Sequence, residues 1–274
     1  DGEERRAEMN RKIVIWFVLM VFFGVFFVWM LAYSSMQRSR QVVGHVDMKI
    51  ERDGPLCLQE EDIMAWLKQR GIRLQGKSFD ELNVSNIEQI LAQNPYVSSV
   101  HVYPVGDSVL NVDMRQRDPV LKVYNMHQTF FQIDEDGVEM PVNLKYPARL
   151  RVLTGFLPYA PVYGLNVRDL ADTSRQVALR TAFALNEFLR KDPFWDAMFE
   201  QIFLNEKQEF ELVPKVGGQL VKLGRIASLA DLESKMERLW LFYQYGIGDH
   251  GWERYSILDL RYEGQLVATK RRGH

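Results

Sequence analysis

YVSSVHVYPVGDSVLNVDMR, residues Tyr96–Arg115, contains two runs in which apolar and polar residues alternate. Between the runs lie Pro104, Gly106 and Asp107, which are typical turn residues. Alternation with a period of two indicates strands with one buried face, and a short turn between two such strands indicates a β-hairpin. The stretch therefore predicts two neighbouring antiparallel strands.

The residues before this hairpin predict one strand and two helices. Val43–Ile50 is short and rich in β-branched residues, which favours a strand, and Glu60–Arg70 has apolar residues at helical spacing. Ser85 and Glu88 have the spacing of a capping box at the start of a second helix, which ends before a proline. The predicted order of this first module is β-α-α-β-β.

A phosphate-binding pattern overlaps this module. Gly71–Ser78, GIRLQGKS, matches G-x-x-x-x-G-K-S letter for letter. A working loop of this kind leaves a buried strand and enters a helix at once. Here the predicted helix Glu60–Arg70 precedes Gly71, and the next helix begins only near Ser85. We interpret the match as accidental, with Gly71 at the carboxyl end of a helix.

After Asp118-Pro119 the pattern becomes rich in strands, with embedded helices. One helix is predicted from about Thr173 to Arg190, and another follows Ser228, which has Asp231 as its capping partner, through Tyr245. Strands are predicted at Val120–Tyr124, Thr129–Ile133, Glu200–Leu204, Glu209–Val213, Gln219–Leu223, Tyr255–Tyr262 and Gln265–Thr269. The fold class is therefore α+β, with a second, sheet-rich domain.

An apolar segment precedes both modules. Ile13–Tyr33, IVIWFVLMVFFGVFFVWMLAY, carries no charge. As a helix it would match a hydrocarbon core of roughly 30 Å, which predicts a transmembrane helix. A cleaved signal peptide is less favoured, because the apolar run is too long for a signal core and lacks an A-x-A site. More basic residues precede the run than follow it, so we expect the amino terminus to stay inside and the rest to be exported.

These boundaries give a domain organisation for the whole chain. We predict a cytoplasmic stub, a transmembrane helix, a linker, the first module, the sheet-rich domain and a short tail, at residues 1–12, 13–33, 34–42, 43–117, 118–270 and 271–274.

Composition excludes several classes of function. The net charge is −2, so no basic face for nucleic acid is expected, and the single Cys57 cannot form an intrachain disulfide. The histidines never occur at metal-ligand spacing, and no nucleophile motif is present, so we expect no cofactor, no metal and no enzymatic activity. Asp134–Gly137, DEDG, resembles the opening of a calcium loop, but the closing glutamate is missing and a hairpin turn with Gly137 at positive φ is preferred.

The carboxyl-terminal strand pair is the most informative remaining feature. In YSILDLRY, alternate residues face opposite sides, with Leu258, Leu260 and Tyr262 on one and the residues between them on the other. Gln265–Thr269 follows near the end of the sequence, so we expect its outer edge to be uncovered. An open edge strand either aggregates or is meant to be paired.

Taken together, these motifs resemble the FtsQ/DivIB family of bacterial cell-division proteins over nearly the whole chain. NPYVSSVHV, residues 94–102, after the helical segment 86–91, is similar to the family's helix, turn and W-I-x-x-V-x-V strand. Residues 107–112 and 117–120 resemble the run that joins its two exported domains, and residues 133–137 match a V-D-x-x-G turn. Arg151–Gly155 is similar to its L-P-x-L-x-G element, although Arg149 and Leu150 replace the usual proline start. Ser256–Tyr262 is closest of all, to x-x-V-D-L-R-Y.

The resemblance implies a POTRA domain at residues 43–117 and a β domain at residues 118–270. It implies a non-enzymatic, single-pass scaffold of the divisome in the inner membrane, with its bulk in the periplasm at the division septum. FtsB and FtsL would bind the β domain, FtsB by adding a strand to the last strand, and so regulate septal peptidoglycan synthesis by FtsW–FtsI. Other divisome proteins would contact the POTRA domain. The partner contact falls on Tyr255, Ser256, Ile257, Leu258, Asp259, Leu260, Arg261, Tyr262, Leu266, Val267, Ala268 and Thr269.

Two alternatives remain open. A POTRA-bearing component of secretion or outer-membrane assembly would share the first module, but it would carry repeats of that module or a transmembrane barrel. A membrane-anchored enzyme of the cell wall would need a catalytic constellation that the sequence does not display.

Overall fold

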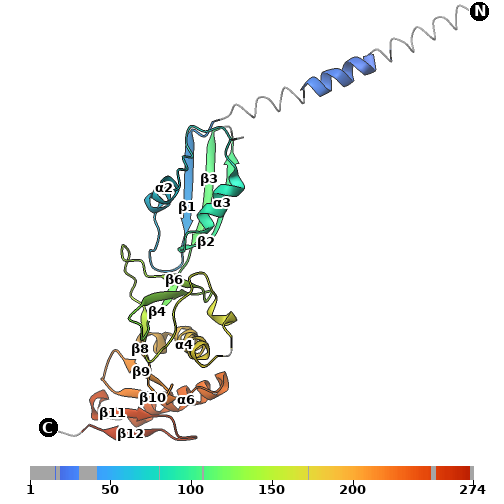
Figure 1. The fold of residues 1–274 in the computed structure, drawn as a ribbon. Coiled ribbons are helices and arrows are strands. Elements are labelled where there is room, and N and C mark those ends of the chain that lie inside the picture. The colour runs from blue at the N-terminus through green and yellow to red at the C-terminus, as the bar shows by residue number, and fades with distance from the viewer. Residues whose placement is uncertain are drawn as a thin grey trace, which may run out of the picture. The chain divides into compact units, whose positions relative to one another are not determined.

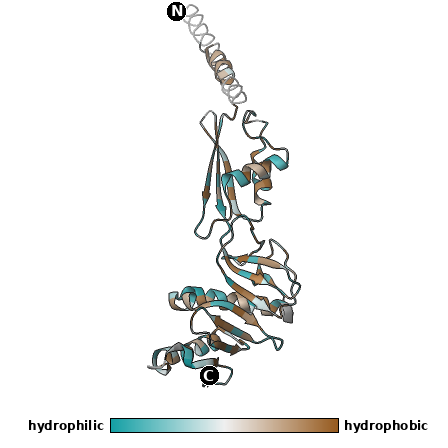
Figure 2. Cartoon of the chain, turned by 90° about the vertical axis from the view of Figure 1, so that its left-hand side faces the viewer, coloured by the Kyte–Doolittle hydropathy of each residue, from teal (hydrophilic) through white to brown (hydrophobic). Residues whose placement is uncertain are grey.

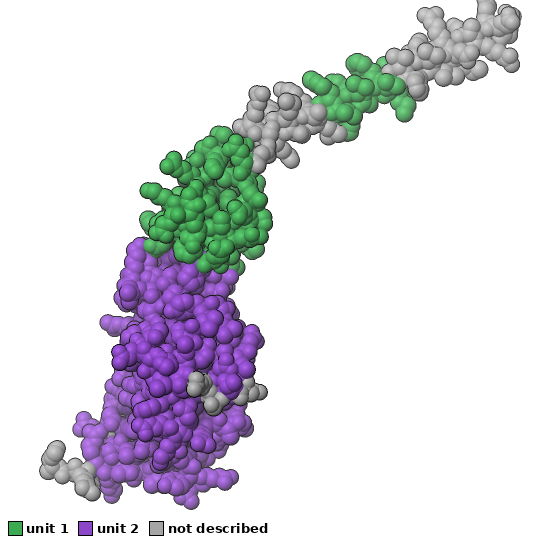
Figure 3. Space-filling model, in the orientation of Figure 1, with its two compact units in different colours: residues 1–50, 60–93, 99–114 green, residues 51–59, 94–98, 115–274 purple. Residues whose placement is uncertain are grey.

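The computed structural model of this chain describes residues 16, 19–30, 42–79, 81–106, 108–171, 173–247 and 251–271. The chain divides into two compact units, shown in different colours in Figure 3. The first unit consists of residues 1–50, 60–93 and 99–114, and the second of residues 51–59, 94–98 and 115–274.

The predicted membrane span falls partly on described residues. Residues 19–30 are helical, and the rest of Ile13–Tyr33 apart from residue 16 lies outside the described residues (Figure 1). Within the described part of the chain, none of the helices combines the length and the apolar character needed to cross a bilayer. The transmembrane helix therefore stays a prediction. The predicted stub, residues 34–41 of the predicted linker and residues 272–274 also lie outside the described residues.

The first module has the predicted order β-α-α-β-β. Its sheet has the order β1-β3-β2. The elements are β1 His45–Glu51, α2 Glu60–Gln69, α3 Val84–Ala92, β2 Val97–Val105 and β3 Val109–Gln116. Each helix buries its apolar side, with Ile63 and Leu67 on α2 and Ile87 and Leu91 on α3. The hairpin predicted from the alternating stretch is formed by β2 and β3.

The predicted capping box of α3 is wrong. The helix begins one residue before Ser85, and Asn83 caps it instead, with its side-chain oxygen accepting from the Asn86 amide at 3.0 Å. The Glu88 carboxylate does not reach back to the helix start, but accepts from the amide of Val102 on β2 at 2.7 Å. Glu88 therefore ties α3 to the sheet.

The helices around the phosphate-binding pattern lie where the sequence predicts them. Helix α2 precedes Gly71, whose φ is 72°, and the amide of Ile72 donates back to the Leu67 carbonyl at 3.0 Å. This is a helix carboxyl cap. Because α3 begins only at Val84, the described residues place no helix start beside Lys77 to help hold a phosphate.

The second unit is built on a nine-stranded sheet, ordered β12-β11-β10-β9-β8-β7-β4-β5-β6. The strands are β4 Pro119–Tyr124, β5 Phe130–Asp134, β6 Glu139–Pro141, β7 Arg151–Gly155, β8 Phe199–Leu204, β9 Phe210–Pro214, β10 Leu220–Gly224, β11 Tyr255–Asp259 and β12 Val267–Lys270. The helical segments are η1 Val167–Asp169, α4 Ser174–Lys191, α5 Pro193–Met198, α6 Leu229–Leu241, η2 Phe242–Gly246 and η4 Trp252–Arg254. The sequence-based prediction missed β6, β7 and α5.

One core holds this unit together. Alternate strand residues are buried against the apolar sides of α4 and α6, and the helices show both brown and teal positions in Figure 2. Leu153 on β7 and Ile202 on β8 are fully buried, as are Leu179 on α4 and Leu239 on α6. Residues between the buried strand positions, such as Lys122, stay partly exposed. The sheet therefore has one well-buried side, as the alternating patterns predict.

Two local predictions in this unit are confirmed. The Ser228 hydroxyl accepts from the Asp231 amide at 3.2 Å and caps α6, which ends at Leu241, earlier than predicted, and continues as the wider turn η2. Gly137 has a φ of 88°, as expected of a hairpin turn between β5 and β6. The Asp134 carboxylate in this turn accepts from the Val138 amide at 2.7 Å.

Candidate functional site

Among the described residues, the sheet of the second unit ends in a strand with one unpaired side. Strand β11 pairs in parallel with β10 and antiparallel with β12. β12 comes first in the strand order, and no strand of the described residues pairs with its outer side. An edge strand therefore exists as predicted, but at Val267–Lys270 and not at Gln265–Thr269.

The inner side of β12 is identified by two hydrogen bonds. The Arg271 amide, next after the strand, donates to the Arg254 carbonyl at 2.8 Å. The Ser256 hydroxyl donates to the Thr269 carbonyl at 3.3 Å. Main-chain groups of alternate residues on a strand point to opposite sides. Residue 271 and residue 269 therefore direct their amides and carbonyls toward β11.

Continuing this alternation gives the outer side. The pairing of β11 and β12 is irregular between Tyr255 and Ile257 of β11, whereas the partner residues on β12 are consecutive. The alternation along β12 is therefore unbroken, and the amides of Ala268 and Lys270 point outward. These amides, together with the carbonyls of the same residues, are main-chain groups available to an added strand.

The predicted site residues lie together on β11, β12 and the turn between them, but they are not equally accessible. Val267 and Tyr262 are 43% and 54% exposed. Leu258 and Leu260 are completely buried in the core, and Asp259 is 8% exposed. Contacts with another molecule are therefore available to the main chain of β12 and to its exposed side chains, whereas Leu258 and Leu260 hold the edge in place.

One prediction about this strand is wrong. β11 ends at Asp259, not at Tyr262, and the amide of Leu260 donates to the Lys222 carbonyl at 2.9 Å. Tyr262 consequently lies in the turn, largely exposed, and does not share the buried side of Leu258. The alternating pattern continues past the strand because Leu260 is buried by a turn.

An ion pair fixes the exit from β11. The Arg261 guanidinium donates to both carboxylate oxygens of Asp259, with contacts between 2.6 and 3.2 Å, and its main-chain amide donates to the same carboxylate at 3.1 Å. Hydrogen bonding by Arg261 holds the pKa of Asp259 below its usual value. Gly224 leaves room for this side chain, since a Cβ there would lie 2.8 Å from Cγ of Arg261. Asp259 and Arg261 of the D-L-R sequence thus hold the chain in place where it leaves β11.

Arg261→Ala should lower the free energy of unfolding by about 1 to 2 kcal/mol at pH 7, because the charged hydrogen bonds to Asp259 are lost. The folded protein favours the ionised carboxylate, so this stabilisation is present above the unfolded pKa of Asp259, about 3.9, and is lost as the pH falls through the folded pKa. Urea unfolding across this pH range measures it. The difference between wild type and variant should shrink toward pH 2, whereas exposed Lys270→Ala should cost little at any pH. A difference in the free energy of unfolding that does not change with pH would contradict the assignment of this stabilisation to the Arg261–Asp259 ion pair.

Three carboxylates in the second unit are close enough to resemble a cation site. Ligand oxygens of Asp53, Asp118 and Glu135 lie within 4.8 Å of one another. Arg115 already forms ion pairs with Asp53 at 2.6 Å and with Glu135 at 3.3 Å, and Asp118 accepts from the Asp53 amide at 2.9 Å. The group is an internal ion-pair network, and we assign no metal to it.

The part of the chain that carries the edge strand matches a known family. Residues 118–269, more than half of the chain, match the family model described as FtsQ/DivIB, C-terminal related. The chain belongs to the FtsQ/DivIB family. Residues 55–115 match a model described as a POTRA-like domain, in agreement with the β-α-α-β-β order of the first module. Both parts of the resemblance seen in the sequence are therefore confirmed.

A curated relative supports the FtsQ/DivIB assignment. The "Cell division protein FtsQ" of Rhodothermus marinus is 26% identical to this chain over 206 residues. The similarity covers 71% of this chain and 68% of the relative.

Proposed function

We propose that this FtsQ/DivIB chain is a non-enzymatic scaffold of the bacterial cell-division machinery. The family match and the relative named as a cell-division protein support this role. The scaffold would bind the FtsB–FtsL pair through its second unit and act through that pair on FtsW–FtsI and septal peptidoglycan synthesis. The first unit, with its POTRA-like match, would contact other division proteins.

The observation that carries the partner assignment is the unpaired outer side of β12. Main-chain donors at Ala268 and Lys270 point away from β11, and Val267 is 43% exposed beside them. Strand addition uses such main-chain groups for affinity and alternate side chains for selection. A strand of FtsB aligned along β12 would satisfy these donors and cover Val267.

The proposal includes membrane anchoring through Ile13–Tyr33, with the amino terminus in the cytoplasm and the two units in the periplasm. Its support is the uncharged apolar run and the basic residues that precede it. Alkaline phosphatase fused after Thr269 should be active, and the same enzyme fused at Met9 inactive. The reverse pattern of activities would contradict this orientation.

Binding of the full chain to a co-purified FtsB–FtsL complex tests the proposed function. The full chain should retain the complex on an affinity resin, whereas a chain truncated after Gly264, which lacks β12, should not. Circular dichroism of the truncated chain must show that the rest of the fold persists. If a folded truncated chain retained the complex equally well, the binding site would lie outside β12. If the full chain did not retain the complex, the proposal that FtsB–FtsL is the partner would be wrong.

A further inference from the structure

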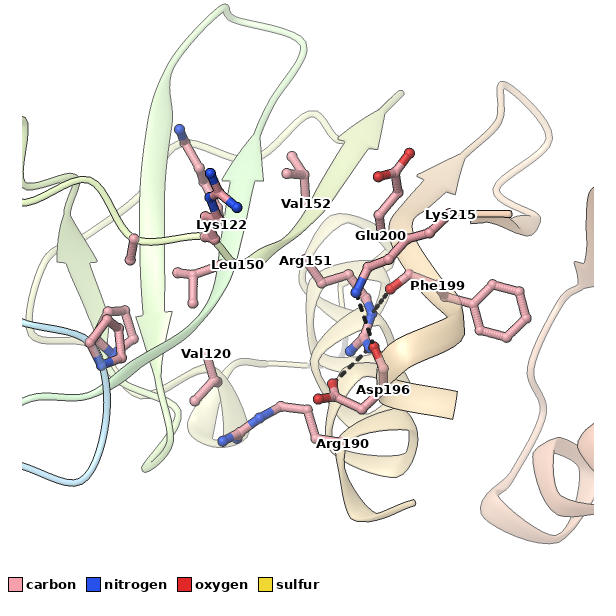
Figure 4. Close-up of a pocket in the computed structure, with 14 residues that line it drawn as sticks. Val120, Lys122, Leu150, Arg151, Val152, Arg190, Asp196, Phe199, Glu200 and Lys215 are labelled. Carbon is pink, nitrogen blue, oxygen red and sulfur yellow. Dashed lines mark hydrogen bonds and ion pairs between the residues drawn. The ribbon is translucent and has the colours of Figure 1, made fainter. Parts of the chain in front are cut away.

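A cleft of about 720 Å³ opens in the second unit, away from β12. It lies where β4, β7 and β8 begin, and Figure 4 shows side chains from these strands, from the end of α4 and from α5 around it. Its volume is within the range of roughly 300 to 1,000 Å³ that is usual for binding sites. Nothing in the proposed contact at β12 uses these residues.

The lining of this cleft is mainly basic, although the chain as a whole has a net charge of −2. The basic side chains are Lys122, Arg149, Arg151, Arg190 and Lys215. The acidic side chains are Asp196 and Glu200. A local excess of positive charge on an acidic chain favours an anionic ligand.

Arg151 belongs to the frame of the cleft. Its side chain is 4% exposed and donates to the Asn186 side chain at 2.6 Å, to the Asp196 carboxylate at 2.9 Å and to the Phe199 carbonyl at 3.1 Å. Burial lowers the pKa of this guanidinium, and the positive charge of Arg190 lowers it further. Asp196 is therefore occupied by Arg151, which leaves Glu200 as the one other acidic side chain of the lining against Lys122, Arg149, Arg190 and Lys215.

The remaining cations have no carboxylate partner among the described residues. Arg149 and Arg190 are exposed, and neither forms a hydrogen bond or an ion pair there. The Lys122 ammonium lies 5.1 Å from the centre of the Phe130 ring, and that of Lys215 lies 3.5 Å from the Asp196 carbonyl oxygen. These charges can bind a ligand without breaking an existing ion pair.

The cleft also has an apolar wall, formed by Val120, Leu150 and Val152. In Figure 4 Val120 and Leu150 stand between Lys122 and Arg190, and Val152 lies beside Lys122. A ligand that fits must therefore present aliphatic groups together with separated negative charges. We propose that this cleft binds an acidic peptide segment of a partner protein, with aliphatic side chains on this wall and carboxylates at Arg149, Arg190 and Lys122.

A phosphate group or a lipid headgroup fits less well. Phosphate sites gather donors around one point and often use main-chain amides at the start of a helix. Here the cations lie on β4, in the segment before β7, directly after β9 and in the last turn of α4, which is a helix end and not a helix start. Separated cations along an apolar wall match the spacing of side chains on a peptide.

Fluorescence anisotropy of the full chain in detergent, with a fluorescein-labelled peptide of alternating Glu and Leu residues, tests this proposal. We expect saturable binding that weakens with salt. The double variant Arg149→Glu with Arg190→Glu should weaken binding on the order of 100-fold, because attraction at both exposed cations becomes repulsion. The matched double variant Arg73→Glu with Lys207→Glu makes the same charge change at exposed positions outside the cleft and should change affinity less than about threefold.

Several outcomes would overturn the proposal. They are an absence of saturable binding, equal binding of a Gln and Leu peptide, and equal losses in the two double variants. Phosphatidylglycerol vesicles and inorganic phosphate serve as further probes. Cleft-dependent binding of the vesicles, but not of the peptide, would assign the cleft to lipid instead. The proposed contact at β12 can fail or succeed independently, because the peptide assay does not use FtsB–FtsL.

Discussion

Ala268→Pro should abolish most of the binding of FtsB–FtsL while leaving the protein folded. Proline removes the amide that points outward from β12, and it is tolerated on an edge strand when that side faces solvent. The partner carbonyl that would accept from this amide is left without a donor, which should cost about 1 to 3 kcal/mol of binding free energy, or roughly 5- to 150-fold in affinity. Isothermal titration calorimetry with the purified complex measures this change.

Ala268→Val provides the matched control, since it keeps the amide and adds a side chain that favours strands. Its affinity should lie within a few fold of wild type. Circular dichroism and urea unfolding should show the same fold for both variants. If the folded proline variant bound as tightly as wild type, main-chain pairing at this edge would not be the source of affinity.

Gly155→Ala should strongly lower the stability of the second unit, by more than Arg261→Ala or Gly164→Ala. Gly155 has a φ of 108°, which L-residues rarely adopt, and an added Cβ would lie 2.1 Å from the Leu204 carbonyl oxygen. The two residues face each other in the pairing of β7 with β8, so both strands would have to move apart. The free energy of unfolding in urea, followed by fluorescence, should fall by on the order of 4 kcal/mol or more.

Gly164→Ala separates the two causes of this loss. Gly164 also has a positive φ, 88°, but an added Cβ would meet no atom within 4 Å. Its cost should be limited to about 1 to 2 kcal/mol from the backbone conformation. Equal costs at the two glycines would show that the close approach of β8 contributes nothing.

Elements with strong local patterns could be predicted from the sequence. The β2–β3 hairpin and the β-α-α-β-β order follow from alternation, helical spacing and turn residues. The cap of α3 was missed because Asn83 and Ser85 are both good capping residues, and only the packing of α3 on β2 engages Glu88 elsewhere. The short β6 and the six-residue α5 carry too few periods to be recognised.

The candidate edge was accessible to sequence reasoning because it lies in one continuous stretch. The end of β11 could not be predicted from the sequence, because Leu260 is buried in a turn and resembles a further buried strand position. The basic cleft was invisible for a different reason. Its cations are spread from Lys122 to Lys215 on separate elements, and only the fold of the sheet brings them together.

Hydrogen–deuterium exchange of the full chain, with and without FtsB–FtsL, tests the central claim most directly. In the free chain the amides of Ala268 and Lys270 point outward and should exchange quickly, whereas those of Val267 and Thr269 should already be protected by β11. Exchange resolved to single residues should slow at Ala268 and Lys270 when FtsB–FtsL is bound. Unchanged fast exchange at both amides in the saturated complex would contradict strand addition at β12.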